Sequence, residues 1–388
     1  MNAKFTGLTW DHPRGYEALA EAARKVNAEH PGAPLLHWNK QPLEGFESAP
    51  IAQLASENDL VVMDHPHIGE AVAEDCLVPI EDLFPETTIA AWGRQSIGPS
   101  MRSYLWQGKH WALPLDVAMQ TMMRRADMVA TPPDSWEAVL DMAHKVPVAQ
   151  SLAGPHAILT LMSICGGAGV APRGDEIWPE APALRGLEIM HRLYRLRPPG
   201  SETLNPIQMS EVMARGDEIA LVPLIFNYIT YARAGDGRYP LAFSDSLRTA
   251  SGLGGMIGGT GIAFTKRCQP DPELLAHVRW LMDPPTQTRF LPAHGGQPSA
   301  RVAWQDDAVN RDWGKFYRDT AATAEHALLR PRFDGYVDFQ TRGGARVRQA
   351  LETGEAEHQT LAALRSLWQE IRSRSRGDLD DTRPQANG

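Results

Sequence analysis

The alternation of short apolar runs with a helix-like segment near the amino end of the chain constrains its fold most. Residues 4–10, 35–38 and 60–63 have the composition of strands, and residues 15–29 place their apolar side chains on one helical face. The third run is apolar throughout and ends at the polar residues 64–67, which is typical of a buried parallel strand with a polar loop at its carboxyl end. This order of elements predicts an α/β domain with a mostly parallel sheet.

The rest of the chain predicts more helices and at least two more strands. One helix begins at Asp134 or Ser135, since either side chain can cap it. Strands are predicted over 218–226 and, after a glycine-rich passage at 252–261, over 262–265. Further helices are predicted over 155–165, 182–195, 206–215, 272–282, 284–291 and 355–374.

Composition excludes several classes of protein. At about 150 residues per domain, 388 residues predict two to three domains. The net charge of −9 argues against a nucleic-acid partner, which would need a basic face. No apolar run reaches the roughly 18 residues of a membrane span. The three cysteines lie far apart without metal-ligand spacing, so we expect no disulfide, no metal and no cofactor.

The two ends of the sequence differ in character. Residues 1–4 lead directly into the first predicted strand, without the basic and apolar regions of a signal peptide. This predicts a cytoplasmic protein if the chain is complete, and a periplasmic one if a leader has been trimmed. Residues 376–388 are polar, and we expect them to form a disordered tail.

Five segments, in their order and spacing, carry a resemblance to a known family. They are Cys76–Leu83 (CLVPIEDL), Gln107–Pro114 (QGKHWALP), Pro132–Glu137 (PPDSWE), Met213–Ala220 (MARGDEIA) and Ala276–Pro298, which ends in HGGQP. Together they resemble the extracellular solute-binding proteins of ABC transporters, in the family that includes the maltose- and oligosaccharide-binding proteins.

The resemblance implies an α/β, two-lobed periplasmic-binding-protein-like fold of type II. Lobe one would hold residues 1–113 and 260–305, and lobe two residues 114–259 and 306–375, with strands that cross between them as a hinge. A ligand cleft between the lobes and hinge closure around the ligand are further implications. We expect a monomer that binds a small molecule and serves an ABC-transporter permease, without nucleic acid and without insertion into the membrane.

Polar and aromatic residues at strand ends are the candidates for solute binding, because loops at the carboxyl ends of strands line ligand sites in α/β folds. Carboxylates and amides can bond the hydroxyl groups of a sugar, and flat rings can cover its C–H faces. The candidates in these loops are Trp10, Asp11, His12, Trp38, Asn39, Asp64, His65, His67, Asn227 and Tyr228. A core position is the alternative for any tryptophan, and it is expected for Trp136, Trp280 and Trp368.

Other candidates come from the glycine-rich passage and from later in the chain. The passage lacks the Lys-Ser/Thr pair of a phosphate-binding loop and does not open a helix. Close approach of the backbone is the better explanation, with Gly258, Gly259 and Thr260 lining the site. Asp116 and Gln120, just past a crossing strand, are further candidates. Arg330 could favour an acidic ligand through bidentate pairing, the alternative being a surface loop with salt bridges.

The sequence leaves two functions open, solute binding and catalysis, and the choice depends on the part that the Asp–His pairs play. The fold would bring the loops with His12 and His65 together, where His12, Asp64, His65 and His67 could bind a ligand, play a structural part, act as acid–base groups or hold a metal. The preferred interpretation assigns no catalytic residue. It is reversible binding of a small polar solute, a carbohydrate or related polyol or sugar acid, as the substrate-binding component of an ABC transporter. The alternative is a leaderless cytoplasmic enzyme that uses these four residues on a small hydroxylated or acidic substrate.

Overall fold

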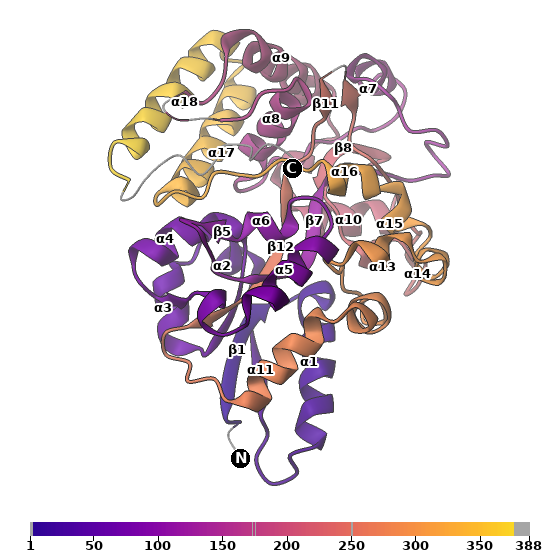
Figure 1. The fold of residues 1–388 in the computed structure, drawn as a ribbon. Coiled ribbons are helices and arrows are strands. Elements are labelled where there is room, and N and C mark those ends of the chain that lie inside the picture. Colours follow the sequence, from indigo (N-terminus) through magenta and orange to yellow (C-terminus); the bar gives the residue numbers. More distant parts are fainter. Residues whose placement is uncertain (1–2, 173, 175, 250, 376–388) are drawn as a thin grey trace. The chain divides into compact units, whose positions relative to one another are not determined.

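The computed structural model describes residues 3–172, 174, 176–249 and 251–375, and the chain divides into two compact units (Figure 1). Unit 1 comprises Met1–Ala118, Gly258–Asp312 and Arg332–Asp334. Unit 2 comprises Met119–Ile257, Trp313–Pro331 and Gly335–Gly388. The sequence predicts divisions at residues 113, 259 and 305, and it predicts no return of the chain to unit 1 at 332–334. The predicted tail, 376–388, lies outside the described residues.

Unit 1 is built on a mixed sheet. Its strands follow the order β2 (Leu36–Gln41), β1 (Phe5–Trp10), β3 (Leu60–Met63), β12 (Ile257–Thr265) and β7 (Leu113–Arg124). The first three strands are parallel, as predicted, whereas β12 runs antiparallel to β3 and also pairs with the short β4 (Leu77–Val78). Strand β7 continues beyond Ala118 into unit 2, so it is one of the places where the chain passes between the units.

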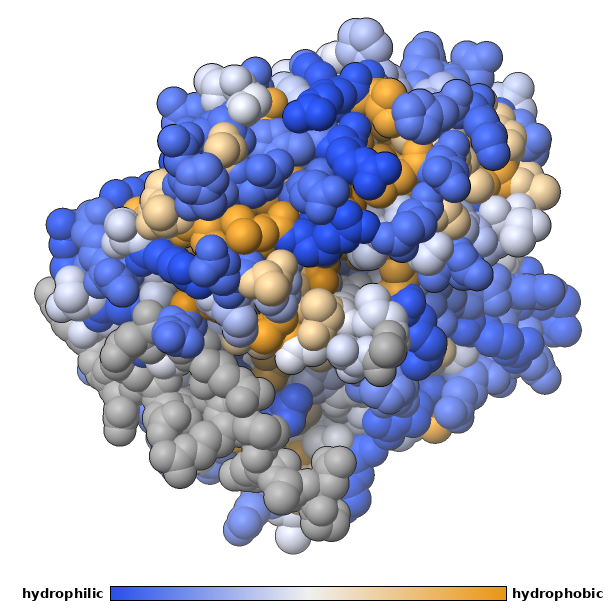
Figure 2. All heavy atoms as spheres, turned by 90° about the horizontal axis from the view of Figure 1, so that it is seen from above, coloured by the Kyte–Doolittle hydropathy of each residue, from blue (hydrophilic) through white to orange (hydrophobic). Residues whose placement is uncertain are grey.

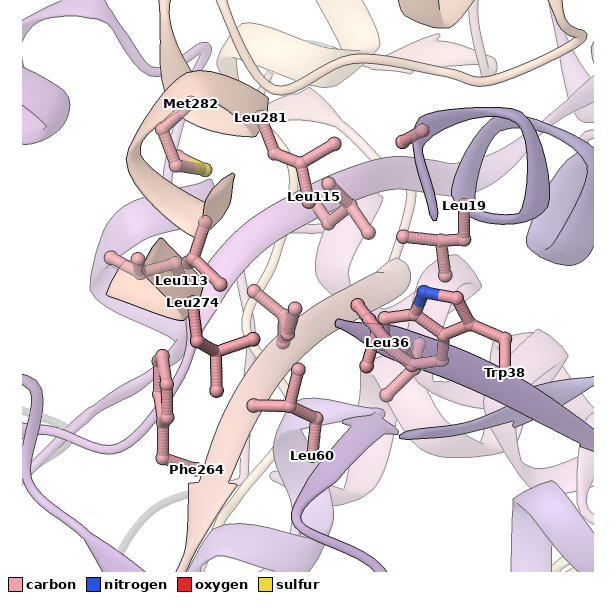
Figure 3. Close-up of a cluster of buried hydrophobic side chains, with 14 of the residues drawn as sticks. Leu19, Leu36, Trp38, Leu60, Leu113, Leu115, Phe264, Leu274, Leu281 and Met282 are labelled. Carbon is pink, nitrogen blue, oxygen red and sulfur yellow. The ribbon is translucent and has the colours of Figure 1, made fainter. Parts of the chain in front are cut away.

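Helices cover the sheet of unit 1 and complete its core. Helix α1 (Pro13–Ala28) buries Leu19 and the small residues Ala18, Ala22 and Ala23, and α11 (Pro272–Met282) buries Leu274 and Leu281. Figure 3 shows Leu19, Leu274 and Leu281 in one buried cluster with Leu60 and Phe264 of the strands. The other helices of the unit are α2 (Leu43–Ser48), α3 (Ile51–Glu57), η1 (His65–His67), α4 (Ile68–Ala73), η2 (Ile80–Asp82), α5 (Glu86–Gln95), α6 (Ser100–Ser103), η5 (Thr286–Phe290), α12 (Leu291–Ala293), α13 (Arg301–Gln305) and α14 (Asp307–Asp312). A two-stranded ribbon joins β5 (Leu105–Trp106) to β6 (Lys109–His110).

Unit 2 combines a small antiparallel sheet with a group of long helices. Strands β8 (Leu221–Phe226) and β9 (Ala242–Ser244) pair with the second part of β7, and β10 (Arg248–Thr249) pairs with β11 (Gly252–Leu253). Helix α8 (His156–Gly167) is buried along its whole length, as expected for a helix that is apolar all round. It packs against α9 (Glu180–Leu196) and α17 (Tyr336–Thr353), and α18 (Glu357–Arg372) packs on both (Figure 1). The remaining helices are α7 (Trp136–Met142), η3 (Ser201–Thr203), α10 (Pro206–Arg215), η4 (Ile229–Tyr231), α15 (Phe316–Asp319) and α16 (Ala321–Glu325).

Most predicted elements are confirmed, and the differences have local causes. The helices predicted over 206–215 and 272–282 have the predicted bounds, and the Ser135 hydroxyl caps α7 by accepting from the Ala138 amide. Strand β12 begins five residues before the predicted 262–265, because glycines of the passage pair in the sheet. Helix α17 was not predicted, since its sequence is rich in arginine and contains a pair of glycines.

The surface agrees with the acidic, polar composition. On the face drawn in Figure 2, hydrophilic residues cover most of the surface and hydrophobic residues form smaller patches. Within the described part of the chain, no helix has both the length and the apolar character needed to cross a bilayer.

Candidate functional site

The loops after β1 and β3 lie at the same edge of the sheet of unit 1. These two strands are parallel neighbours, with Gly7 opposite Leu60 and Leu8 opposite Val61. Their carboxyl ends therefore bring the segment at Asp11 and the segment at Asp64 together, as the sequence predicts.

Two of the predicted residues in these loops cap the helices that follow. The Nδ1 atom of His12 accepts a hydrogen bond from the Arg14 amide at 3.1 Å and opens α1. Asp64 opens η1, where its Oδ1 atom accepts from the His65 amide at 2.9 Å. Nδ1 of His65 lies 3.1 Å from that same oxygen. Both side chains thus hold the loops in shape, and the Asp64 side chain stays 17% exposed.

His65 and His67 are buried within unit 1. The ring of His65 meets the ring of Tyr104 edge-on, with the centroids 6.4 Å apart, and the Tyr104 hydroxyl donates to the Met63 carbonyl at 3.3 Å. These contacts favour the structural role for His65 among the roles left open. Among the described residues, no three His, Cys, Asp or Glu side chains are arranged to hold a metal ion.

Asp11 and Asn39 are exposed. The Asp11 carboxylate pairs with the Lys40 ammonium at 2.7 Å, and this hydrogen bond raises the pKa of Lys40. The Lys40 ammonium also lies 4.6 Å from the ring centroid of Tyr16. Asn39 was predicted in a loop after the second strand. This is wrong in detail, because β2 continues to Gln41 and Asn39 lies within the strand, opposite Leu8.

Trp10 and Trp38 are packed in the core of unit 1, with 2% and 3% of their surface exposed. Glycines make room for both: a Cβ atom at Gly15 would lie 2.4 Å from the Trp10 ring, and one at Gly7 would lie 2.5 Å from the Trp38 ring. Trp38 lies beside Leu19 and Leu36 in Figure 3. Both rings are therefore almost wholly buried, and the sequence reveals neither glycine contact.

The tryptophans expected in the core, and Cys165, have different degrees of burial. Trp368 is fully buried on α18, whereas Trp136 and Trp280 are half-buried. Cys165 is buried, as predicted, and burial raises the pKa of its thiol to about 12. A thiol with this pKa is protonated at neutral pH and is a poor nucleophile.

Asp116 is half of a buried ion pair with Arg14, and their side chains are 6% and 4% exposed. Nη2 of Arg14 donates to Oδ2 of Asp116 at 2.5 Å, and Nε donates to both carboxylate oxygens at 3.1 Å. The Gln297 amide adds a further hydrogen bond to Oδ1 at 3.2 Å. The Asp116 carboxylate, which the sequence predicts to contact a ligand, is therefore hydrogen-bonded to Arg14 and Gln297 of its own unit.

The glycine-rich passage approaches a neighbouring strand closely. Gly259 has φ +98°, a conformation that side chains rarely adopt, and a Cβ atom there would lie 2.2 Å from the Asp116 carbonyl oxygen of β7. The close approach of the backbone that the sequence predicts is thus an approach of β12 to β7. Gly258 is half-buried, and Thr260 is buried. Thr260 also lines a cavity of about 20 Å³ together with Trp10 and Asp116.

Asn227 and Tyr228 belong to unit 2, at the end of β8. Asn227 is fully buried, and both its backbone amide and its Oδ1 atom bond to the backbone of Met119, each at 3.3 Å. Its amide group holds β8 to β7. Tyr228 is buried immediately before η4.

Arg330 is buried in unit 2, so the alternative of a surface loop is wrong. Its Nε atom donates to the Ile257 carbonyl at 3.1 Å, and Nη1 donates to Oε1 of Gln340 at 3.1 Å. The guanidinium also lies 5.7 Å from the ring centroid of Phe226. Arg330 thus joins the start of β12 to α17.

Sequence reasoning missed Arg14 and Ser163, and it named Gln120 only as a candidate for lining the ligand site. Arg14 lies in the first turn of α1, where a cation opposes the helix dipole, and this conflict could have indicated a buried partner. In unit 2, Ser163 donates to Oε1 of Gln120 at 2.5 Å and accepts from the Met256 amide at 3.0 Å. The Nε2 atom of Gln120 is buried and has no hydrogen-bond partner among the described residues. No local pattern indicates this network.

Solved structures share the fold along nearly the whole chain. An ABC-transporter solute-binding protein from Agrobacterium radiobacter K84, in complex with ribitol, is 18% identical, with a TM-score of 0.77 over 95% of this chain and 99% of that one. Maltose-bound MalE3 of T. maritima is 13% identical, with a TM-score of 0.78 over 96% and 100%. UgpB from Mycobacterium tuberculosis, in complex with glycerophosphocholine, is 13% identical, with a TM-score of 0.76 over 96% and 99%. The fold is thus the α/β, two-lobed fold of type II periplasmic binding proteins, as predicted.

A family model identifies the chain at the level of sequence. No curated protein matches it. Residues 22–317, more than half of the chain, match the model of the bacterial extracellular solute-binding proteins. The chain therefore belongs to the family of bacterial extracellular solute-binding proteins.

Proposed function

We propose that the protein binds a small polyhydroxylated solute, a sugar or a sugar alcohol, reversibly and delivers it to the membrane component of an ABC transporter. The observation that supports this most is the sheet edge of unit 1, where Asp11 and Asp64 follow two neighbouring parallel strands. Carboxylates at such an edge can accept hydrogen bonds from several hydroxyl groups. The ribitol and maltose held by similar structures are ligands of this kind.

Some of the predicted candidates suit this role better than others. The side chains of Asp11, Asn39 and Asp64 keep exposed polar surface. In the sequence, His12 comes between Asp11 and α1. Asp116, Asn227 and Arg330 use their polar groups within their own units. We therefore assign contact with the solute to Asp11, Asn39 and Asp64, and not to His12, which is buried and caps α1 through its Nδ1 atom.

Replacing Asp64 by alanine is expected to weaken solute binding about 10- to 100-fold, because a hydrogen bond to a charged group contributes about 1.5–3 kcal/mol. Without ligand, the variant should lose only the cap of η1, about 1 kcal/mol. The measurement is calorimetric titration with ribitol, mannitol, tagatose, maltose and glycerophosphocholine. Asp64→Asn serves as the conservative variant, since asparagine also caps helices but carries no charge.

Glu57→Ala is the matched control, because Glu57 is an exposed carboxylate just before β3, near the opposite end of that strand. It should bind the solute as the wild type does. Unchanged binding by Asp64→Ala would exclude Asp64 from the site. If only glycerophosphocholine bound, the polyol class would be wrong. A bound compound recovered chemically altered would instead support the enzyme alternative.

A further inference from the structure

Unit 1 contains a groove that plays no part in the function proposed above. It lies between α1 and α11, which both belong to this unit (Figure 1). Its volume is about 510 Å³. Sites for small molecules have volumes of about 300–1,000 Å³, so the groove is large enough for one.

Part of the lining of the groove is apolar and includes one aromatic ring, and the rest is ionisable: Lys25, Glu29, His30, Glu273 and His277. Ala22 and Val26 of α1 face Ala276 and Trp280 of α11 across it. Trp280 is half-buried, and its ring packs edge-on against Phe290 with centroids 4.9 Å apart. The Lys25 ammonium lies over the Trp280 ring, 4.6 Å from its centroid, so a planar ligand on this face of the ring takes the place of the Lys25 side chain.

One buried polar group lines the groove. His277 is 5% exposed and stacks on Trp280, with centroids 6.0 Å apart and planes inclined by 28°. Its Nε2 atom is buried and has no hydrogen-bond partner among the described residues. Burial also lowers the pKa of this imidazole to about 4, so that the ring is uncharged at neutral pH. An uncharged imidazole can make hydrogen bonds but offers no charge to a ligand.

We propose that this groove is a second binding site, for a small planar aromatic molecule with a single hydroxyl or N–H group, such as a phenol or an indole. The alanines, Val26 and the face of Trp280 suit the ring, and His277 suits one hydrogen-bonding group. A sugar does not fit, because most of its hydroxyl groups would lose water and find no partner there. The charges at the groove, Lys25 opposed by Glu29 and Glu273, sum to −1 and disfavour an anion.

The first test uses 4-fluorophenol, followed by fluorine NMR as the protein is added. The wild type should bind it saturably. Ala276→Leu should weaken binding at least tenfold, because the larger side chain fills the groove from an exposed position that tolerates it. Ala91→Leu is the matched control, since Ala91 is equally exposed on α5 and does not line the groove. Absence of saturable binding, or equal binding by Ala276→Leu and Ala91→Leu, would overturn the proposal.

The second test asks whether His277 bonds the polar group. Fluorobenzene has the ring of 4-fluorophenol without its hydroxyl, so the wild type should bind it at least tenfold more weakly. His277→Leu keeps an apolar side chain at the position and should bind both compounds equally. A preference for the phenol that persists in His277→Leu would show that the imidazole does not bond the hydroxyl. Mannitol and ribitol should not displace the phenol, and displacement would place it in the solute site instead.

Discussion

Asp116→Ala is expected to lower the free energy of unfolding by about 3–5 kcal/mol, the usual cost of removing one partner of a buried ion pair. The variant leaves the Arg14 guanidinium buried, 4% exposed, without the carboxylate that accepts its three hydrogen bonds. It also removes the acceptor of the Gln297 amide. Urea unfolding, with the midpoint and slope measured separately, checks the loss.

Two companion variants separate the loss of a partner from the loss of a charge. The double variant Arg14→Met/Asp116→Leu removes both charges and should recover most of the stability, since apolar side chains often replace a buried ion pair without cost. Asp11→Ala is the surface control. It breaks an ion pair with the exposed Lys40 and should change stability little. If Asp116→Ala unfolded like the wild type but no longer bound the solute, Asp116 would be a ligand contact and not a structural residue.

The fold was predictable because its signals are local. Strand β3 is an unbroken apolar run, α1 repeats apolar residues at helical spacing, and Ser135 caps α7 within three residues of its partner. Each of these patterns depends on neighbours in sequence, where periodicity and capping chemistry act. The antiparallel course of β12 could not be predicted in this way, because its partner β3 lies about 200 residues earlier.

The candidate site was less predictable, because residue type does not show which contacts tertiary packing has already made. Asp116 and Arg14 are 102 positions apart, and nothing near either residue indicates the other except the unfavourable place of Arg14 in its helix. Trp38 has a flat ring of the kind that can stack on a sugar. It lies in the core instead, where it packs against Gly7, which has no side chain to clash with the ring. The prediction of contact with a solute suits residues that stay exposed after β1 and β3, such as Asp11, better than it suits the buried Asp116 and Trp38.

Lowering the pH from 7 to 4 is expected to reduce the free energy of unfolding of unit 1 by about 3 kcal/mol through the protonation of His277 alone. Burial lowers the pKa of the folded imidazole to about 4 from its usual 6.5, so the unfolded chain binds the proton more tightly than the folded one does. The stability that this group contributes is therefore complete above pH 6.5 and is lost as the pH falls toward 4. His277→Leu, which cannot be protonated, should lack this part of the acid sensitivity.

The measurement is the difference in unfolding free energy between the wild type and His277→Leu, determined by urea unfolding at several pH values between 7 and 4. Subtraction is needed because other ionisable groups are present: Glu29, His30 and Glu273 line the same groove between α1 and α11, and burial also lowers the pKa of His191 in unit 2. These groups are present in both proteins, and so is the positive charge of Lys25. Between pH 7 and pH 4 the wild type should lose about 3 kcal/mol more of its unfolding free energy than His277→Leu loses. Parallel loss in the two proteins would mean that the folded protein accepts the proton on His277 without penalty, as it would if the groove admitted water to the ring.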